Sequence, residues 1–258
     1  MNNKVWSMDL DEIVDDESLI DVKKFHQSTC TINRYSGLNP LDSKILQWLK
    51  ENEYTQTLPN NYLQEIQLKK EKRTNIGSKR NYSKNYITKY EMSKILFKAF
   101  GSKVINPSKP YPSAGALYPI TPVLVVLEDD EYLKRGCYIY NCYKNSLLHI
   151  KVFTYSDINE IKNIISFLPN NEFISNYFMA YAINLKKAIA KYKKRGYRYS
   201  LIEIGLMCQS LRYALHHNDF CDEMGELIWA GFDDNALTNI LGLNVSDFPI
   251  GLIQWFGK

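Results

Sequence analysis

The sequence has few cysteines and no pattern that would build a disulfide framework or a metal site. Its five cysteines are an odd number spread over 258 residues, and no two of them form a Cys-x-x-Cys pair. Such usage is typical of a reducing compartment and argues against a zinc ribbon. The histidines are His26, His149 and the neighbours His216 and His217. They lack the spacing of a metal-binding motif, so we expect neither a metal site nor histidine catalysis.

Long hydrophobic runs and a secretory leader are also missing. The longest apolar stretch, residues 201–211, is interrupted by Glu203 and Gln209 and is too short to cross a membrane. The chain begins with polar residues that run into the acidic stretch 9–17, and no apolar core precedes a cleavage site there. These observations predict a cytoplasmic protein that has no membrane partner.

Neither sign of charge dominates the composition. Lysine and arginine number 32 against 28 aspartates and glutamates, which gives a net charge of +4. Two local basic clusters, 69–80 and 186–198, are too limited to predict nucleic-acid binding. With 45% hydrophobic and 23% charged residues, the chain has enough apolar material for a sizeable folded core.

Helix and strand signals do not alternate regularly enough for a doubly wound sheet, so the predicted class is α+β. A mostly helical lead-in is expected over 1–70 and the main domain over 71–258, after a basic irregular segment. Thr88 and Glu91 form a capping box for a helix that should end at Gly101. Strands are expected over 120–127, 137–143, 147–153, 177–183, 228–230 and 249–256, and further helices over 157–167, 197–215 and from Asp233 or Asp234 to Gly242.

Two segments are candidates for a functional site. The loop 106–119 contains four prolines and Gly115, a composition typical of a rigid loop that positions other groups. The helix over 197–215 is apolar on nearly every face, which predicts burial on all sides or a place in a subunit interface. Glu203 lies inside that helix and needs a partner, which we expect to be an arginine.

Three segments share their order and spacing with one known family. They are Pro-Tyr-Pro-Ser-Ala-Gly-Ala-Leu-Tyr-Pro at 110–119, Lys-Tyr-Lys-Lys-Arg-Gly-Tyr-Arg-Tyr at 191–199, and Ala-Gly-Phe-Asp-Asp at 230–234. From about residue 75 onward the chain thereby resembles the nitroreductase-like flavoproteins. Within them it is most similar to the azoline dehydrogenases of thiazole/oxazole-modified microcin and streptolysin-type (SagB-like) clusters. Most of 1–70 has no counterpart.

The resemblance implies a nitroreductase-like fold, with a central antiparallel or mixed sheet flanked by helices. It also implies an intertwined homodimer with one FMN at each subunit interface. The implied activity is oxidation of thiazolines or oxazolines in a precursor peptide, in company with cyclodehydratase subunits. Two alternatives remain open. One is NAD(P)H-driven reduction of dehydroamino acids, nitro compounds or quinones, and the other is a docking protein that has lost catalysis.

The catalytic residues implied by the resemblance are Lys191 and Tyr192. Azoline oxidation removes a proton from Cα and a hydride from Cβ, and no side chain can accept a hydride, so a cofactor must. A base must take the proton. Lysines are normally protonated at neutral pH, so the charged form must be disfavoured by burial beside the flavin or by nearby cations. The alternative is that Lys191 belongs to a solvated basic helix end.

The cofactor-binding residues implied by the resemblance fall into two sets. Gly77-Ser78-Lys79-Arg80 stands where the family has an Arg-Ser-x-Arg-like phosphate-binding stretch, although the first arginine is missing here. The competing interpretations are that Arg80 is only an exposed loop charge, and that the segment 113–115 and Gly231 form plain turns. The expected phosphate ligands are Ser78, Arg80 and Lys258, and the expected flavin contacts are Ser113, Ala114, Gly115, Gln209 and Gly231.

Overall fold

The computed structural model divides the chain into two compact units. Residues 1–33 and 78–258 form the first unit, and 34–77 form the second, whose helix α2 spans Ser43–Asn52. Helix α1 (Asp16–Thr29) belongs to the first unit, and the expected domain division at residues 70 and 71 stays a prediction. The residues described are 10–32, 43–52, 55, 56, 58, 61–71, 77–83, 85–103, 107–165, 168, 172–217, 219 and 223–258.

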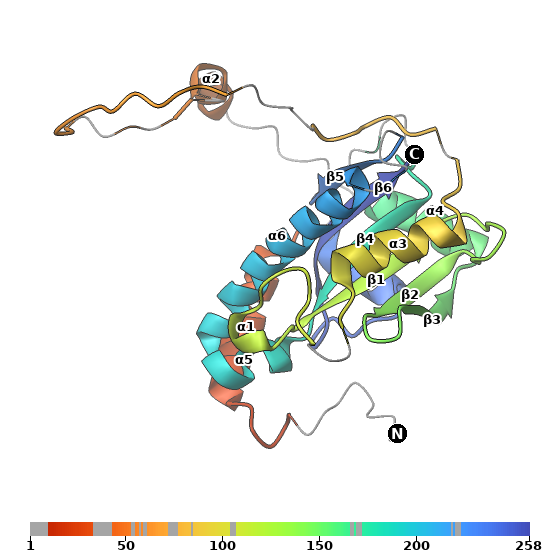
Figure 1. Ribbon diagram of the computed structural model, residues 1–258. Helices are drawn as coiled ribbons and strands as arrows, with labels where there is room; N and C mark the ends of the chain where they lie inside the picture. Colours follow the sequence, from red (N-terminus) through yellow and green to blue (C-terminus); the bar gives the residue numbers. More distant parts are fainter. Residues whose placement is uncertain are drawn as a thin grey trace. The chain divides into compact units, whose positions relative to one another are not determined.

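A six-stranded antiparallel sheet forms the centre of the first unit (Figure 1), in the order β3-β2-β1-β4-β6-β5. The α+β class is confirmed, and each predicted strand is present within a few residues of its expected bounds. The strands are β1 (Ile120–Val126), β2 (Gly136–Asn141), β3 (Ser146–Val152), β4 (Tyr177–Ile183), β5 (Gly225–Trp229) and β6 (Ile250–Gly257).

Helices cover both faces of the sheet, because successive strand residues point to opposite sides. On β4, Met179 and Tyr181 join one core, whereas Phe178 and Ala180 join the other. Helix α1 lies against α5 and α6. The first core contains residues of α3 (Lys89–Phe100), α5 (Leu185–Tyr192) and α6 (Lys194–His216), and the second contains residues of α4 (Tyr155–Ile164) and α7 (Asp234–Ile240).

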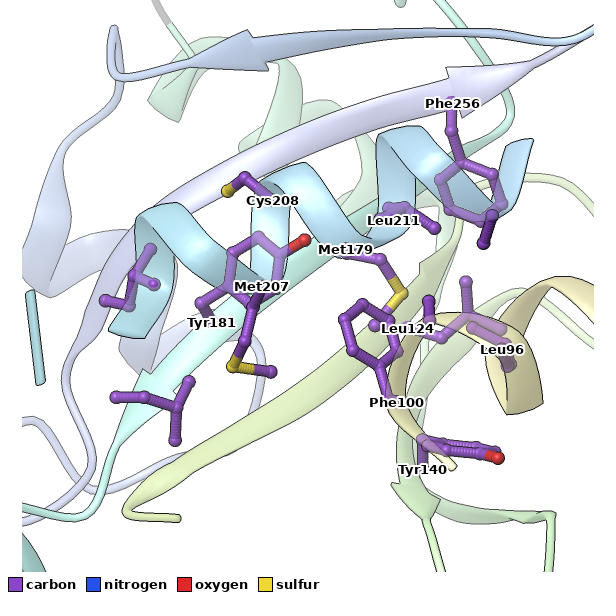
Figure 2. Packing of buried hydrophobic residues seen from close by; sticks show 14 of the residues in the cluster. Leu96, Phe100, Leu124, Tyr140, Met179, Tyr181, Met207, Cys208, Leu211 and Phe256 are labelled. Atoms are coloured by element: carbon purple, nitrogen blue, oxygen red, sulfur yellow. The ribbon is translucent and has the colours of Figure 1, made fainter. Parts of the chain in front are cut away.

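Helix α6 is held against the sheet by a layer of buried side chains. Figure 2 shows Met207, Cys208 and Leu211 of α6 over the sheet, with Tyr181 from β4 and Phe100 from α3 beside them. Each of the five is at most 1% exposed. Burial of one large apolar side chain contributes about 1.5–3 kcal/mol. This layer therefore fixes α6 as a rigid support for the segments packed on it.

Two capping boxes set the starts of α3 and α4. The box of Thr88 and Glu91 begins α3 as predicted, and Gly101 follows its last residue. The prediction that this helix starts at Asp157 is wrong by two residues, since α4 begins at Tyr155. Thr154 is the cap, because its hydroxyl accepts from the Asp157 amide while the Asp157 carboxylate accepts from the Thr154 amide. Helix α4 ends at Ile164, and the predicted end at residue 167 lies outside the described residues.

One face of α6 is open to solvent in the single chain. Leu201, Ile202, Leu206 and Tyr213 are 42%, 55%, 36% and 52% exposed. The alternative that this helix is buried on all sides is therefore wrong, and the alternative of a subunit interface stays a prediction. Among the described helices, none is long and apolar enough to span a membrane.

Candidate functional site

Lys191 and Tyr192 form the last turn of α5, directly before α6 begins. The two helices meet so closely that a Cβ on Gly196 would lie 1.9 Å from the Ala188 carbonyl oxygen. Tyr192 packs edge-on against Tyr199 of α6, with ring centroids 5.4 Å apart and an interplanar angle of 88°. The ammonium of Lys191 lies 5.4 Å from the Tyr192 ring centroid. Helix packing thus fixes Tyr192, whereas the Lys191 side chain stays exposed.

The proline-rich loop covers this pair of side chains. Gly115 has a φ of +61°, and a Cβ at that position would lie 2.6 Å from the Tyr192 hydroxyl oxygen and 3.0 Å from Lys191 Nζ. Only glycine adopts this conformation without steric cost and leaves room for both groups. The structure therefore brings together two of the predicted sets of residues, the loop and the Lys-Tyr pair.

Beneath the loop lies Glu203, the carboxylate for which the sequence predicted a partner. Glu203 is 2% exposed and accepts a hydrogen bond from the Ser113 hydroxyl. The expectation of an arginine partner for Glu203 is wrong, since the cations that face it are Lys109 and Lys187. Burial raises the pKa of Glu203, and the Ser113 hydroxyl and then the two lysines oppose that rise. The sequence indicated that Glu203 needs a partner, because it is a carboxylate inside an apolar helix. It could not identify the partners, because they come from distant segments.

The predicted phosphate ligands lie at another place in the unit. The segment 78–83 runs beside the ends of two strands, since the Lys79 amide donates to the Glu226 carbonyl at 2.9 Å and the Ser83 amide to the Lys258 carbonyl at 2.7 Å. Ser78, just before the first anchor, and Arg80, between the two anchors, are exposed. Their side chains are therefore accessible to a ligand.

Lys258 already has an anionic partner. Its ammonium lies 2.8 Å from Glu91 Oε1, and the two side chains are 14% and 12% exposed. Burial raises the pKa of Glu91, but its hydrogen bonds with Lys258 and Thr88 outweigh burial, and the net shift is downward. A phosphate at Lys258 would have to compete with this ion pair.

The segment that carries the predicted phosphate ligands and the Lys191–Tyr192 pair lie at opposite ends of α6 (Figure 1). Tyr192 packs on Tyr199 near the start of the helix, whereas Glu226, next to Lys79, pairs with Arg212 near its end. The intervening helix is about 20 Å long at 1.5 Å per residue. One chain therefore does not bring the phosphate ligands to the Lys191 pair.

Gly231 and Gln209 lie apart from the Lys191 pair. Gly231 follows β5, and its carbonyl accepts a hydrogen bond from Trp229 Nε1 at 3.1 Å. Asp233 then caps α7, as predicted. Gln209 is exposed in the second half of α6. The part of the chain that the structure describes contains no group of three histidine, cysteine, aspartate or glutamate side chains suited to a metal ion.

Comparisons with known proteins agree with this architecture. No family model matches the sequence. The Microcin B17-processing protein McbC of Escherichia coli is 29% identical over 201 residues, which cover 71% of each chain. A nitroreductase-type protein of Methanocaldococcus jannaschii is 26% identical over 179 residues, covering 68% of this chain and 84% of that protein.

Solved structures extend the likeness to the fold. A chain of the Escherichia coli McbBCD microcin synthetase complex, solved with truncated pro-MccB17 bound, has a TM-score of 0.82 at 23% identity and covers 97% of this chain and 96% of its own. A nitroreductase-type protein of Ralstonia eutropha has a TM-score of 0.56 at 16% identity and covers 79% and 95%. The protein therefore has the nitroreductase-like fold. Within that class it is similar to McbC, in agreement with the resemblance identified from the sequence.

Proposed function

We propose that this protein is an FMN-dependent azoline dehydrogenase, which oxidises thiazolines or oxazolines in a precursor peptide to thiazoles or oxazoles. The observation that carries the proposal is the Lys191–Tyr192 pair, held against the backbone of Gly115. Similarity to McbC, a protein named for processing microcin B17, supports a peptide substrate. The nitroreductase-like fold supports flavin chemistry.

Each azoline ring loses two hydrogens in this reaction, the Cα proton and the Cβ hydride. A bound flavin supplies the hydride acceptor, which the side chains of the protein cannot do. Lys191 Nζ takes the proton, because it is the amine exposed next to the covering loop. The Tyr192 hydroxyl lies beside the same glycine as the amine, where it can orient the amine or relay the proton.

The residues present fit a flavin if two copies of the chain combine. Ser78 and Arg80 offer an exposed hydroxyl and an exposed guanidinium for a phosphate dianion. Ser113, Ala114 and Gly115 are small and lie beside Lys191, where a flat ring can approach the backbone. Since these groups are separated along α6 within one chain, we place the loop of one subunit and the phosphate ligands of its partner in each site.

The exposed apolar face of α6 supports the homodimer. Leu201, Ile202, Leu206 and Tyr213 lie along the helix between the two groups, so a second copy covering them would bring the groups of different subunits together. Gln209 lies on the same helix and would then face the partner. Lys258 lies near the segment of the phosphate ligands, but its ammonium is paired with Glu91. Gly231 lies past the other end of β5 and stays a candidate flavin contact.

We further propose that the enzyme works in the cytoplasm with cyclodehydratase subunits that form its azoline substrate. A neighbour in structure belongs to a synthetase complex solved with a precursor bound, which supports such an assembly. The described cysteines Cys30, Cys137, Cys142 and Cys208 are free thiols, in keeping with a reducing compartment.

Mass spectrometry of treated peptides tests the function. Purified protein incubated in air with an azoline-bearing peptide should remove two hydrogens per ring. Incubation with NAD(P)H and a dehydroamino-acid peptide should leave the peptide mass unchanged, and a gain of two hydrogens would favour the reductase alternative. Protein that lacks flavin absorbance and changes neither peptide would contradict both enzymatic functions and favour a docking role.

A further inference from the structure

A chain of hydrogen bonds links the buried carboxylate of α6 to the loop above the Lys191 pair. Ser113 donates its hydroxyl proton to Glu203 Oε2, and its oxygen accepts from the Tyr118 amide at 2.9 Å. One serine thus joins both ends of the loop segment 113–118 to the helix. Gly115, the residue that contacts Lys191, lies between these two anchors.

The loop segment needs such an anchor because its backbone is strained. Ala116 and Tyr118 have φ values of +54° and +46°, in the left-handed region that side chains disfavour. Each such residue costs on the order of 1–3 kcal/mol and persists only where its surroundings hold it. Within the loop, Ser113 is joined to α6 through Glu203.

Glu203 is buried among two lysines and a tyrosine, and burial raises its pKa. Lys109 precedes the segment 113–118 in the same loop, Lys187 lies on α5, and burial lowers the pKa of each. Tyr111 also faces Glu203, and burial and the carboxylate both raise its pKa. The Ser113 hydroxyl and the two lysines oppose the effect of burial, although the net shift of the Glu203 pKa is upward. Because Glu203 is buried, loss of its hydrogen bond with Ser113 would leave a second polar atom of the side chain without a partner.

We propose that Glu203 is a positioning residue: through Ser113 it holds the loop segment 113–118 against Lys191 and Tyr192 and so sets the place of the catalytic amine. The catalytic consequence rests on the proposed function, but the geometric consequence does not. A displaced loop would no longer present the Gly115 backbone to Lys191 Nζ.

Kinetics of Glu203 variants give the first test. Glu203→Ala should lower kcat about a hundredfold, as expected for displacement of a catalytic group by about 1 Å, with KM and flavin content near wild type. Glu203→Gln should recover most of this loss, because its amide oxygen can accept the same hydrogen bond. Ser210→Ala is the matched control, since it removes one hydrogen bond of α6, to the Ala99 carbonyl at 2.8 Å, away from the loop. Equal losses in Gln and Ala variants would overturn the proposal.

A double-mutant cycle with Lys191→Ala separates positioning from general destabilisation. If Glu203 acts through Lys191, then Glu203→Ala should cause almost no further loss of kcat in the Lys191→Ala background. Multiplicative losses would show that Glu203 supports something other than Lys191, and would overturn the proposal.

Lysine labelling tests the geometry without any activity. With an amine-reactive ester and peptide mass spectrometry, Lys191 should be labelled faster in Glu203→Ala than in wild type, whereas Lys144, in the turn between β2 and β3, should not change. Ser113→Ala removes the same hydrogen bond and should give the same change, which covers the case that Glu203→Ala does not fold. Unchanged Lys191 labelling in these variants would overturn the positioning role. Faster labelling in a protein that does not oxidise azolines would overturn only the proposed function.

Discussion

Gly115 lies so close to Tyr192 that a methyl group on its Cα would be 2.6 Å from the tyrosine hydroxyl oxygen. The same methyl group would be 3.0 Å from Lys191 Nζ. The loop and the end of α5 are therefore fitted to each other at a single glycine, and the position of the two functional groups depends on that fit.

Gly115→Ala should lower azoline oxidation more than it lowers stability. The φ of +61° costs an alanine about 1–2 kcal/mol, and the added methyl group must also displace Tyr192 or Lys191. Gly242→Ala is the matched control, because Gly242 has a φ of +80° but only the Lys151 side chain nearby, at 3.7 Å. Thermal unfolding should show similar destabilisation in both variants, with activity lost only in Gly115→Ala. Equal activity in the two variants would contradict the fit.

Lys191→Ala should retain flavin and lose ring oxidation by about two to four powers of ten, the usual contribution of a general base. Flavin absorbance of the purified protein and single-turnover oxidation of an azoline peptide would measure the two properties. Lys144→Ala removes a lysine that is also exposed, in a distant turn, and should behave as wild type. Parallel loss of flavin and activity would instead make Lys191 a cofactor-binding or folding residue.

The strands and helix caps could be predicted because they depend on local sequence. Alternation along β4 and the Thr88–Glu91 box are such local signals. Helix α5 was not predicted as a separate element, because it is divided from α6 by Lys193 with a φ of +48°, a conformation that no local residue pattern marks at a lysine.

The candidate site could be predicted only in part. The family resemblance identified the loop and the Lys191 pair, which the structure brings into contact. The partners of Glu203 could not be predicted, because Ser113 and Lys109 lie about 90 residues earlier in the chain and meet it only through the tertiary fold. The separation of Ser78 and Arg80 from Lys191 likewise depends on the path of α6, which residue spacing does not give.

Arg80→Ala should deplete bound FMN before it affects the folded protein, because Arg80 is exposed and available for a phosphate. Lys258→Met should act differently: it removes the ion pair with Glu91 and should mainly lower the free energy of unfolding. Flavin occupancy by absorbance and unfolding by urea distinguish the two variants. Full occupancy in Arg80→Ala would show that the phosphate assignment is wrong.

The free energy of unfolding should decrease as the pH is lowered below about 6.5, because of His26. The side chain is 4% exposed, its Nδ1 lies 2.8 Å from the Tyr197 hydroxyl, and burial lowers its pKa from 6.5. In this window the unfolded chain binds a proton that the folded chain does not, so the free energy of unfolding decreases as pH falls from 6.5 toward the lowered pKa. Glu91 does not contribute to this dependence, because its lowered pKa keeps it ionised over the same pH range.

Urea unfolding at several pH values between 5 and 7.5 would measure this dependence. His26→Gln keeps a polar partner for Tyr197 but cannot take up a proton, so its stability should vary less over this range than that of the wild type. His217→Gln, at an exposed histidine at the end of α6, should keep the wild-type dependence. If the His26→Gln and wild-type curves ran parallel, the buried imidazole would not be the source of the acid sensitivity, and the contact between α1 and α6 would have to be stabilised independently of its protonation.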